Sequence, residues 1–475
     1  MLFTMLATMA IVTQDQAALR AGARESAAQQ AVLWRGDALE VRGRRLDYLQ
    51  VWDHRRERGG FVRASQVRVT ELQPAEAPEL LSVLRFVRDT PGAEALGVAY
   101  AAAYLQAVPP AQLGPEVFDA IGTLADRLAR RAAMKPGQSS SATIAAHLEV
   151  VKFYGVAIGG TERDGQLQPC YDGEAFRRVL ALPSSAEQRA RAALGLTRHD
   201  CVDTSLSPVQ RLPLDQWRAQ VLDQLSAEQF ASLPEQTRNQ LRLRRAGVWA
   251  SLAYQQTRRH EPAAAAAAAQ RALGELAAVN KTELSDDDRA AYQEAAMRVS
   301  ASRWAAEAEP TPAAAGLAIR TEAGQPGETC VQLVDARQPQ ARPLASRCTY
   351  GLVWAASARA NPAGNALALA VQPLDTWREL WVFRRQGKDW VVDALPPAAN
   401  GPELGYLEFA GWVPGSDRLL VARESKVEGR VKRSFEVLKP DTGGQAEKSA
   451  AAPDQIAAFA RWQDPAWKRQ TVSLR

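Results

Sequence analysis

Long apolar runs are missing from this chain of 475 residues. No stretch approaches the roughly 18 continuous apolar residues from which a membrane-spanning helix is recognised, so we expect no membrane span. Charge of one sign is not in large excess either, because 58 basic residues face 53 acidic ones. A net charge of +5 over this length is a weak argument for nucleic acid, and we expect none as a partner.

Metal-ligand and catalytic motifs are also lacking. None of the four histidines has a second histidine, a cysteine or a carboxylate at metal-ligand spacing; they are His54, His147, His199 and His260. The chain contains no G-x-S-x-G elbow, no phosphate-binding loop and no dinucleotide glycine fingerprint. We therefore expect no catalytic residue, no metal and no cofactor, and we expect that the protein is not an enzyme.

Two local motifs have plainer explanations than chemistry. The run His199-Asp200-Cys201 could suggest a thiol with its base, but adjacent residues rarely converge on one point, and Cys201 has a disulfide candidate. The acids Asp286 to Asp288 lack the glycine and the terminal glutamate of a calcium loop. Acidic residues in a first helical turn stabilise the helix N-terminus, and this role explains them better.

Cysteine is as scarce as histidine, but its four residues fall into two local pairs. Cys170 and Cys201 lie just outside the two ends of a predicted helix pair, where an antiparallel fold-back brings them together. Cys330 and Cys348 bracket a stretch that is predicted as strand, turn and strand. We predict two disulfides, Cys170–Cys201 and Cys330–Cys348, and hence an oxidising compartment, the periplasm or the exterior of the cell.

The N-terminal dozen residues form a short apolar segment without the flanks of a complete signal peptide. No basic residue precedes Arg20, and no cleavage site is visible. We predict that residues 1–9 are the remnant of a signal peptide. The alternative is that this segment leads into the first buried strand.

The overall composition, with 46% hydrophobic and 23% charged residues, is typical of a globular protein. The length predicts about two to four domains. Alanine and arginine are abundant while lysine is rare, a usage that suggests a GC-rich bacterial genome.

Residues 10–72 alternate and turn at short intervals, as small all-β domains do. The residues that carry a recognisable pattern are Ala18-Leu19-Arg20, Leu33, Gly36, Leu39-Glu40-Val41, Tyr48, Val51 and Gly60-Phe61-Val62. On these residues the region resembles the bacterial Src homology 3 domain. The resemblance implies a small β-barrel that binds wall peptides or glycans, or serves as a docking module.

One predicted strand of this region, residues 47–53, supplies a candidate ligand surface. Leu49 and Val51 share a face and are expected in the core beside Leu39 and Val41. The other face must then carry Tyr48, Gln50 and Trp52. Two aromatics that flank an amide suit stacking on a sugar ring or holding a short peptide. The alternative is that they pack under the helical domain.

Arginines gather at both ends of the same hairpin strand. Arg42, Arg44 and Arg45 lie at one turn; Arg55, Arg56 and Arg58 lie at the other. The strand between them measures roughly 33 Å, at about 3.3 Å per residue. The two groups cannot form one anion site, and we expect solvated turns.

A helical period follows a linker at residues 73–78. Helices are expected near 79–89, 93–107, 114–134, 142–158, 213–228, 234–258, 262–279 and 285–307, with the disulfide hairpin between the fourth and fifth. In that hairpin, Ser184 or Ser185 is the expected N-cap of the second helix, with Gln188 in capping-box range.

A second linker near Pro310 leads to a C-terminal β region at 317–475. Strands are expected at 328–334, 352–357, 366–371, 378–384, 390–393, 406–409, 418–422 and 434–438. The run from Gly411 to Val421, with a turn at Asp441-Thr442-Gly443, resembles a β-propeller blade of the TolB or WD-repeat sort. We expect an antiparallel sheet or partial propeller, and two soluble pieces after cleavage at Pro310.

The expected fold class is multidomain α+β. A signal-peptide remnant (1–9) precedes a Src homology 3-like barrel (10–72), an all-α helical domain (79–307) and a β domain (317–475). The expected function is that of an exported envelope binding or scaffold protein, with peptidoglycan or an envelope protein as partner. The alternative is an envelope hydrolase whose site is assembled from dispersed residues. The oligomeric state is left open.

Overall fold

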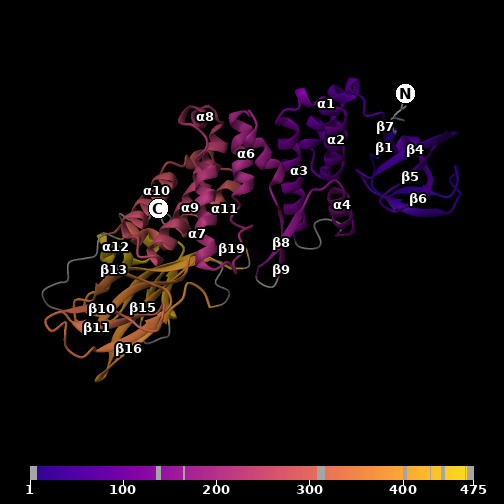
Figure 1. Ribbon diagram of the computed structural model, residues 1–475. Helices are drawn as coiled ribbons and strands as arrows, with labels where there is room; N and C mark the ends of the chain where they lie inside the picture. The colour runs from indigo at the N-terminus through magenta and orange to yellow at the C-terminus, as the bar shows by residue number, and fades with distance from the viewer. Residues whose placement is uncertain are drawn as a thin grey trace. The chain divides into compact units, whose positions relative to one another are not determined.

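The computed structural model describes residues 8–134, 141–163, 166–307, 316–399, 404–427, 429–439, 444–465 and 467. The chain is mixed α+β (Figure 1) and divides into two compact units. Unit 1 comprises Met1–Ser205 and Val221–Leu233, and unit 2 comprises Leu206–Gln220 and Pro234–Arg475. The predicted helical range 79–307 therefore contributes to both units.

Unit 1 begins with an antiparallel sheet of seven strands in the order β3-β2-β6-β5-β4-β1-β7. The strands are β1 (Met9–Val12), β2 (Ala17–Arg20), β3 (Gln29–Leu33), β4 (Ala38–Arg45), β5 (Tyr48–Asp53), β6 (Arg58–Arg63) and β7 (Val67–Thr70). No strand pair among the described residues joins β3 to β7, so the pairing does not close the predicted barrel. The predicted remnant at 1–9 lies mostly outside the described residues, but Met9 belongs to β1.

The helical part of unit 1 packs around one apolar core with a two-stranded hairpin beside it. Its elements are α1 (Ala77–Arg88), α2 (Glu94–Ala107), α3 (Glu116–Ala132), α4 (Ser141–Phe153), β8 (Ile158–Arg163), β9 (Gln166–Tyr171), α5 (Glu174–Ala181), α6 (Ala186–Leu196) and α8 (Ala227–Ser232). Ile11 of β1 belongs to the same core as Val98 of α2, so the N-terminal sheet packs directly on the helices.

Local sequence explains the start of α6. The Ser185 hydroxyl accepts a hydrogen bond from the Gln188 amide at 3.2 Å, and the Gln188 side chain accepts one from the Ser185 amide at 3.0 Å. The predicted capping box is therefore confirmed at Ser185. The predicted helix at 142–158 is shorter than expected, because α4 ends at Phe153 and Gly155 takes a positive φ of 81°.

Unit 2 contains a helical layer and two β-sheets. The helices are α7 (Pro208–Leu222), α9 (Glu235–Arg258), α10 (Pro262–Ala277), α11 (Asp286–Ser302), a 3-10 turn η5 (Arg303–Ala306) and α12 (Ala457–Trp462). Helices α9, α10 and α11 lie side by side (Figure 1), and their apolar side chains share one core. The acids of the first turn of α11 follow the N-cap Ser285, whose side chain accepts from the Asp288 amide, which confirms their helix-start role.

A three-stranded sheet of unit 2 has the order β10-β11-β12 and lies before an eight-stranded sheet in the chain. Its strands are β10 (Leu317–Ala323), β11 (Thr329–Asp335) and β12 (Ala345–Thr349). The larger sheet contains β13 (Leu352–Ala360), β14 (Ala366–Leu374), β15 (Trp377–Gln386), β16 (Asp389–Leu395), β17 (Leu404–Trp412), β18 (Leu419–Val427), β19 (Arg430–Leu438) and β20 (Ala446–Ala450).

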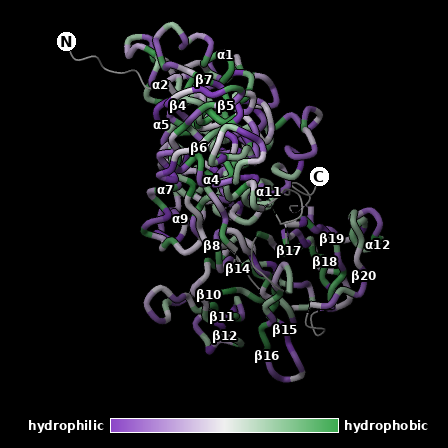
Figure 2. Tube along the Cα trace, turned by 90° about the vertical axis from the view of Figure 1, so that its right-hand side faces the viewer, coloured by the Kyte–Doolittle hydropathy of each residue, from purple (hydrophilic) through white to green (hydrophobic). Residues whose placement is uncertain are grey.

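The eight strands form two antiparallel meanders, β13–β16 and β17–β20, which meet in a short parallel pairing of β15 with β17. Hydrophobic and hydrophilic residues interleave along the traced chain (Figure 2). On one side of β14, Leu369 packs with Leu333 of the smaller sheet, while Ala368 points to a core that contains Leu407 and Val421. The predicted turn at 441–443 lies outside the described residues.

Candidate functional site

Strand β5 sorts its side chains between the core and the other face of the N-terminal sheet. Leu49 and Val51 are buried with Leu39, and Val41 packs against the same cluster. The predicted core face is confirmed, because the period of a strand is two and one side of this sheet is apolar.

Tyr48 lies on the opposite face but is only 6% exposed. It stands directly opposite Arg63 of β6, whose guanidinium carbon is 5.8 Å from the centre of the Tyr48 ring. The Arg63 Nε also donates to the Tyr48 hydroxyl at 3.3 Å. Arg63 therefore occupies the position in which a ligand would stack on Tyr48.

Trp52 is half-buried, and each of its two neighbours explains part of that burial. The Arg42 guanidinium carbon lies 4.5 Å from the centre of the indole ring, a cation–π contact. Gly59 is opposite Trp52 on β6, and a Cβ atom there would come within 3.3 Å of the ring. An aromatic side chain that covers a cross-strand glycine also stabilises the sheet, so Trp52 has a structural role.

The remaining groups on this side of the sheet are polar or partly exposed. Gln50 is exposed and stands opposite the half-buried Phe61 of β6. We call the surface formed by Arg42, Gln50, Trp52, His54 and Phe61 the outer face. It offers an amide and two aromatic edges, which can form hydrogen bonds and ring contacts. The pairing of Tyr48 with Trp52 as a ligand site stays a prediction.

Glu40 lies beside the outer face and contacts two basic side chains. Glu40 accepts from the Arg42 Nε at 3.2 Å, and its other oxygen lies 2.7 Å from the His54 Nε2. The hydrogen bonds from Arg42 and His54 lower the pKa of Glu40, so this carboxylate is ionised at neutral pH. The outer face therefore has the Glu40 carboxylate, held by Arg42 and His54, beside its aromatic residues.

The prediction of solvated arginine turns is correct for Arg44, Arg45 and Arg58 but wrong for Arg55 and Arg56. Arg44 and Arg45 are exposed. Arg55, by contrast, pairs with the buried Asp37 at 2.8 Å. Arg56 pairs with the same carboxylate at 3.0 Å, because the fold brings Asp37 under this turn.

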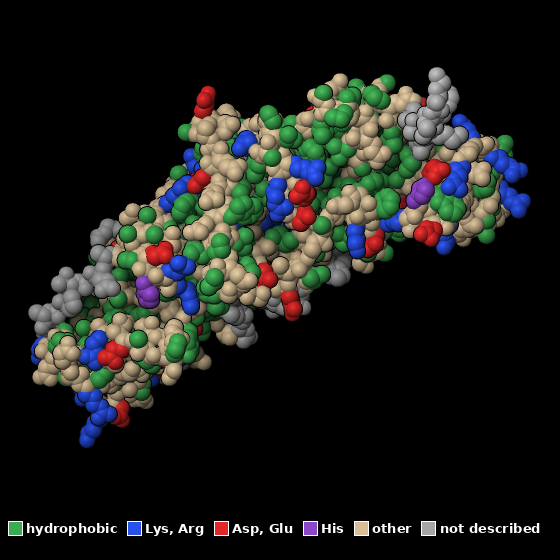
Figure 3. Space-filling model, in the orientation of Figure 1, with side chains coloured by type: hydrophobic (Ala, Val, Ile, Leu, Met, Phe, Trp, Pro, Cys, Tyr) green, Lys and Arg blue, Asp and Glu red, His purple; other side chains and the backbone are tan. Residues whose placement is uncertain are grey.

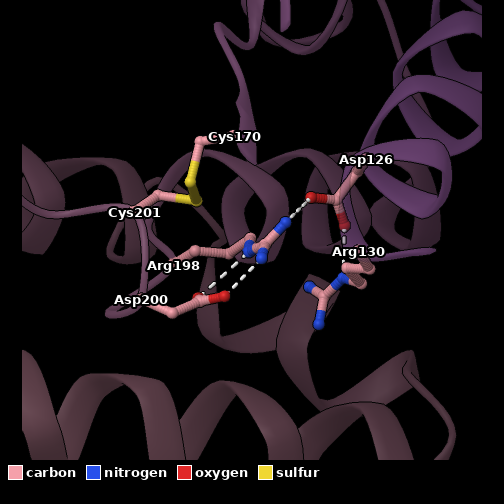
Figure 4. Close-up of a disulfide and its surroundings, with 6 residues drawn as sticks. All are labelled: Asp126, Arg130, Cys170, Arg198, Asp200 and Cys201. Atoms are coloured by element: carbon pink, nitrogen blue, oxygen red, sulfur yellow. Dashed lines mark hydrogen bonds and ion pairs between the residues drawn. A yellow bond between two sulfur atoms is a disulfide. The ribbon is translucent and has the colours of Figure 1, made fainter. Parts of the chain in front are cut away.

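The disulfide Cys170–Cys201 is confirmed, with Cα atoms 5.7 Å apart (Figure 4). Arg198 lies beside it, almost fully buried between two acids. It donates to Asp126, and its Nε donates to Asp200 at 3.1 Å. Burial opposes the charge of Arg198, but the two acids raise its pKa further than burial lowers it. Since Cys201 is in a disulfide and Asp200 binds Arg198, this cluster offers no thiol nucleophile.

The disulfide Cys330–Cys348 is also confirmed, between directly opposite residues of β11 and β12. Among the described residues, one group has the atom spacing of a metal site, and it consists of these cysteines with Glu328. Cysteine binds a metal through its thiolate, and the two sulfurs cannot be thiolates while they are joined in a disulfide. The expectation of no metal or cofactor stays a prediction.

One buried histidine contact was not predicted from the sequence. His147 of α4 is 1% exposed, and its Nε2 lies 2.8 Å from a carboxylate oxygen of Asp15. Asp15 also pairs with Arg35 at 3.4 Å. Because 132 residues separate His147 from Asp15 in the sequence, no local pattern could predict this contact. It ties α4 to the N-terminal sheet, as does the hydrogen bond from Tyr154 to the Gly36 carbonyl.

The visible surface mixes acidic and basic side chains among apolar ones (Figure 3). None of the described helices has both the length and the apolar character that crossing a bilayer requires. Comparison with protein-family models, with curated proteins and with solved structures finds no match to this chain.

Proposed function

We propose that this chain is an exported, non-catalytic binding protein of the cell envelope that engages peptidoglycan through the outer face of its N-terminal sheet. The observation that carries the proposal is the grouping of Trp52, Phe61 and the exposed Gln50 on adjacent strands. Aromatic edges beside an amide match the alternating apolar and hydroxyl surfaces of a sugar ring.

Three further points support the proposal. Both disulfides fit an oxidising compartment, and they stabilise unit 1 and unit 2 separately. The resemblance of residues 10–72 to the bacterial Src homology 3 domain, a barrel fold, favours a wall ligand over an intracellular one. The resemblance of the strands around Gly411 to a propeller blade favours a second binding surface in unit 2, for an envelope protein.

Sedimentation with purified peptidoglycan sacculi tests the proposal. The intact protein is expected to co-sediment. The double variant Gln50→Ala with Trp52→Ala is expected to bind at least about tenfold more weakly, because a ring contact and a hydrogen bond contribute about 1 kcal/mol each. Circular dichroism establishes that the sheet is still folded.

The matched control is Tyr350→Ala, which removes an aromatic side chain that is 59% exposed in unit 2. It should leave sedimentation unchanged. Equal loss in both variants, or no sedimentation of the intact protein, contradicts the proposal.

A further inference from the structure

Unit 2 contains a small charged cavity between its helical layer and its larger sheet. Its volume is about 20 Å³. The lining residues that carry charge or a free indole donor are Arg303, Trp304, Arg359, Arg378, Glu408 and Asp464. Three arginines converge here on one cavity, and nothing in the proposed function uses them.

The floor of the cavity consists of three charged side chains that are at least 97% buried. Arg303 comes from η5, Arg378 from β15 and Glu408 from β17. Glu408 accepts from the Arg303 Nε at 3.1 Å and lies 3.2 Å from the Arg378 Nη2. Another nitrogen of Arg378 donates to the Ser300 carbonyl at 2.6 Å. The floor is therefore held in place by α11 and by two strands.

The residues that line the cavity include two, Arg378 and Trp304, with a buried donor that has no hydrogen-bond acceptor. These donors are the Nε of Arg378, a side chain with no exposed surface, and the indole Nε1 of Trp304, which is 8% exposed. The second oxygen of Glu408 makes no hydrogen bond either, although it faces Arg378. Each buried polar atom without a partner costs about 1–3 kcal/mol, so this pair of donors indicates a bound group.

The charges that line the cavity do not cancel. Arg303, Arg359 and Arg378 give +3, while Glu408 and Asp464 give −2, which leaves +1. Arg359 and Asp464 form the outer edge, with their charged atoms 3.9 Å apart and about a quarter of each side chain exposed. A further acid, Glu307, lies 3.9 Å from Arg303 but is one-third exposed and does not line the cavity.

The cavity is large enough for only one small molecule or one monatomic ion. A volume of about 10–15 Å³ is the least that holds one water molecule, so about 20 Å³ excludes a phosphate, a sugar or a peptide side chain. We propose that the cavity binds one small monovalent anion of the size of chloride, which accepts hydrogen bonds from Arg378 and Trp304.

A water molecule is the competing occupant. Water can accept from both donors and donate to Glu408, but it leaves the buried excess of positive charge in place. An anion offsets that charge at the site where burial is most costly. Burial and the neighbouring Arg303 together lower the pKa of Arg378 more than the attraction of Glu408 raises it.

Bromide identifies the occupant directly, because it replaces chloride and scatters anomalously. Crystals of the full chain grown in sodium bromide are expected to show an anomalous peak within hydrogen-bonding distance of Arg378 Nε and Trp304 Nε1. In solution, chloride should raise Tm saturably by about 2–6 °C relative to gluconate at equal ionic strength. No peak in the cavity, or a water molecule there in bromide crystals, overturns the proposal.

A pair of matched variants removes the donor alone. Trp304→Phe deletes the indole N–H and keeps a ring under Arg303, whose guanidinium carbon lies 4.0 Å from the indole centre. Trp249→Phe makes the same change at another buried indole nitrogen that has no hydrogen bond and does not line the cavity. Trp304→Phe should raise at least tenfold the chloride concentration that gives half of the increase in Tm. Trp249→Phe should leave this concentration unchanged. Equal chloride dependence in the two variants overturns the proposal.

Discussion

At the scale of single residues, unit 1 depends on close approaches that leave no room for a methyl group. The Phe176 ring lies between Gly122 of α3 and Gly195 of α6. A Cβ atom would meet that ring at 2.5 Å from Gly122 and at 2.3 Å from Gly195. Because Phe176 is 97% buried, it has no free direction in which to move.

Gly122→Ala is therefore expected to destabilise unit 1 by about 1–3 kcal/mol, the usual cost of overpacking. Gly274 in α10 is the matched control, because a Cβ atom there has no neighbour within 4 Å. Gly274→Ala should stabilise its helix by about 0.5–1 kcal/mol through helix propensity. Urea unfolding of both variants measures the difference, and a loss of similar size at both positions would contradict the packing argument.

Glu94 is the most confined acid of unit 1, with no exposed surface. It accepts from the Arg127 Nε at 2.6 Å, from Arg131, and from the Gly92 amide at 3.1 Å. Burial alone would raise the pKa of Glu94, but these partners outweigh burial and lower it. Its stabilising effect is therefore fully present above the unfolded-state pKa and is lost as pH falls through the lower folded-state pKa.

Glu94→Gln should cost about 3 kcal/mol at pH 7, because it leaves two arginines without their acid. The cost should shrink as pH falls below the unfolded-state pKa and through the lower folded-state pKa of Glu94, because the wild-type carboxylate then loses its charge as well. Urea unfolding at pH 7 and pH 3 tests this. The control, Glu79→Gln, removes an exposed partner of Arg68 and should cost at most about 1 kcal/mol. If the cost of Glu94→Gln does not change with pH, the ionised carboxylate of Glu94 is not what stabilises unit 1.

At the scale of elements, the sequence predicts what local patterns determine. The capping box at Ser185 and the alternation of Leu49 and Val51 follow from short-range chemistry, and both are confirmed. The hairpin β8–β9 was not predicted, because glycine is a weak strand former and β8 contains Gly159 and Gly160. In the structure a Cβ atom at Gly160 would lie 2.5 Å from Leu167 across the hairpin, so the strand pairing itself favours glycine there. Register likewise decides that Arg63 covers Tyr48.

The disulfide Cys170–Cys201 joins β9 to the segment after α6 across 31 residues of chain. Replacing both cysteines with serine should destabilise unit 1 by about 3–4 kcal/mol, if loop-closure entropy dominates. The same change at Cys330 and Cys348, 18 residues apart, should cost about 3 kcal/mol in unit 2. Unfolding with and without reductant measures both effects. Free thiols in non-reducing peptide maps of the native protein would contradict the pairing.

At the scale of the whole molecule, the sequence separates helices from strands but does not predict which helices pack on which sheet. The turn from helical to β pattern near residue 310 suggested a domain boundary there. The helices before it nevertheless share unit 2 with the C-terminal sheets. Trp304 packs with Trp354 of β13, and Met297 packs with Tyr406 of β17. Such contacts join residues 50 to 109 positions apart, which no local pattern reveals.

These contacts favour a different outcome of cleavage near Pro310 from the two separate soluble pieces expected from the sequence. A protease site inserted at 308–315, outside the described residues, should give two fragments that co-elute in size-exclusion chromatography. The apolar contacts of Trp304 and Met297 and the ion pair of Arg303 with Glu408 hold them together without the covalent link.

Residues 317–475 expressed alone should aggregate, because their side of that interface exposes Trp354, Leu404 and Tyr406 and leaves the charge of Glu408 without Arg303. Co-expression with residues 206–307 supplies the missing helices and should restore a soluble complex. Trp304→Ala with Met297→Ala in that helical fragment should weaken the complex. The matched change Phe86→Ala in full-length cleaved protein, at a 76% exposed position of unit 1, should not release the fragments. A monomeric, soluble 317–475 fragment would mean that the sheets of unit 2 fold independently of the helices that cover them.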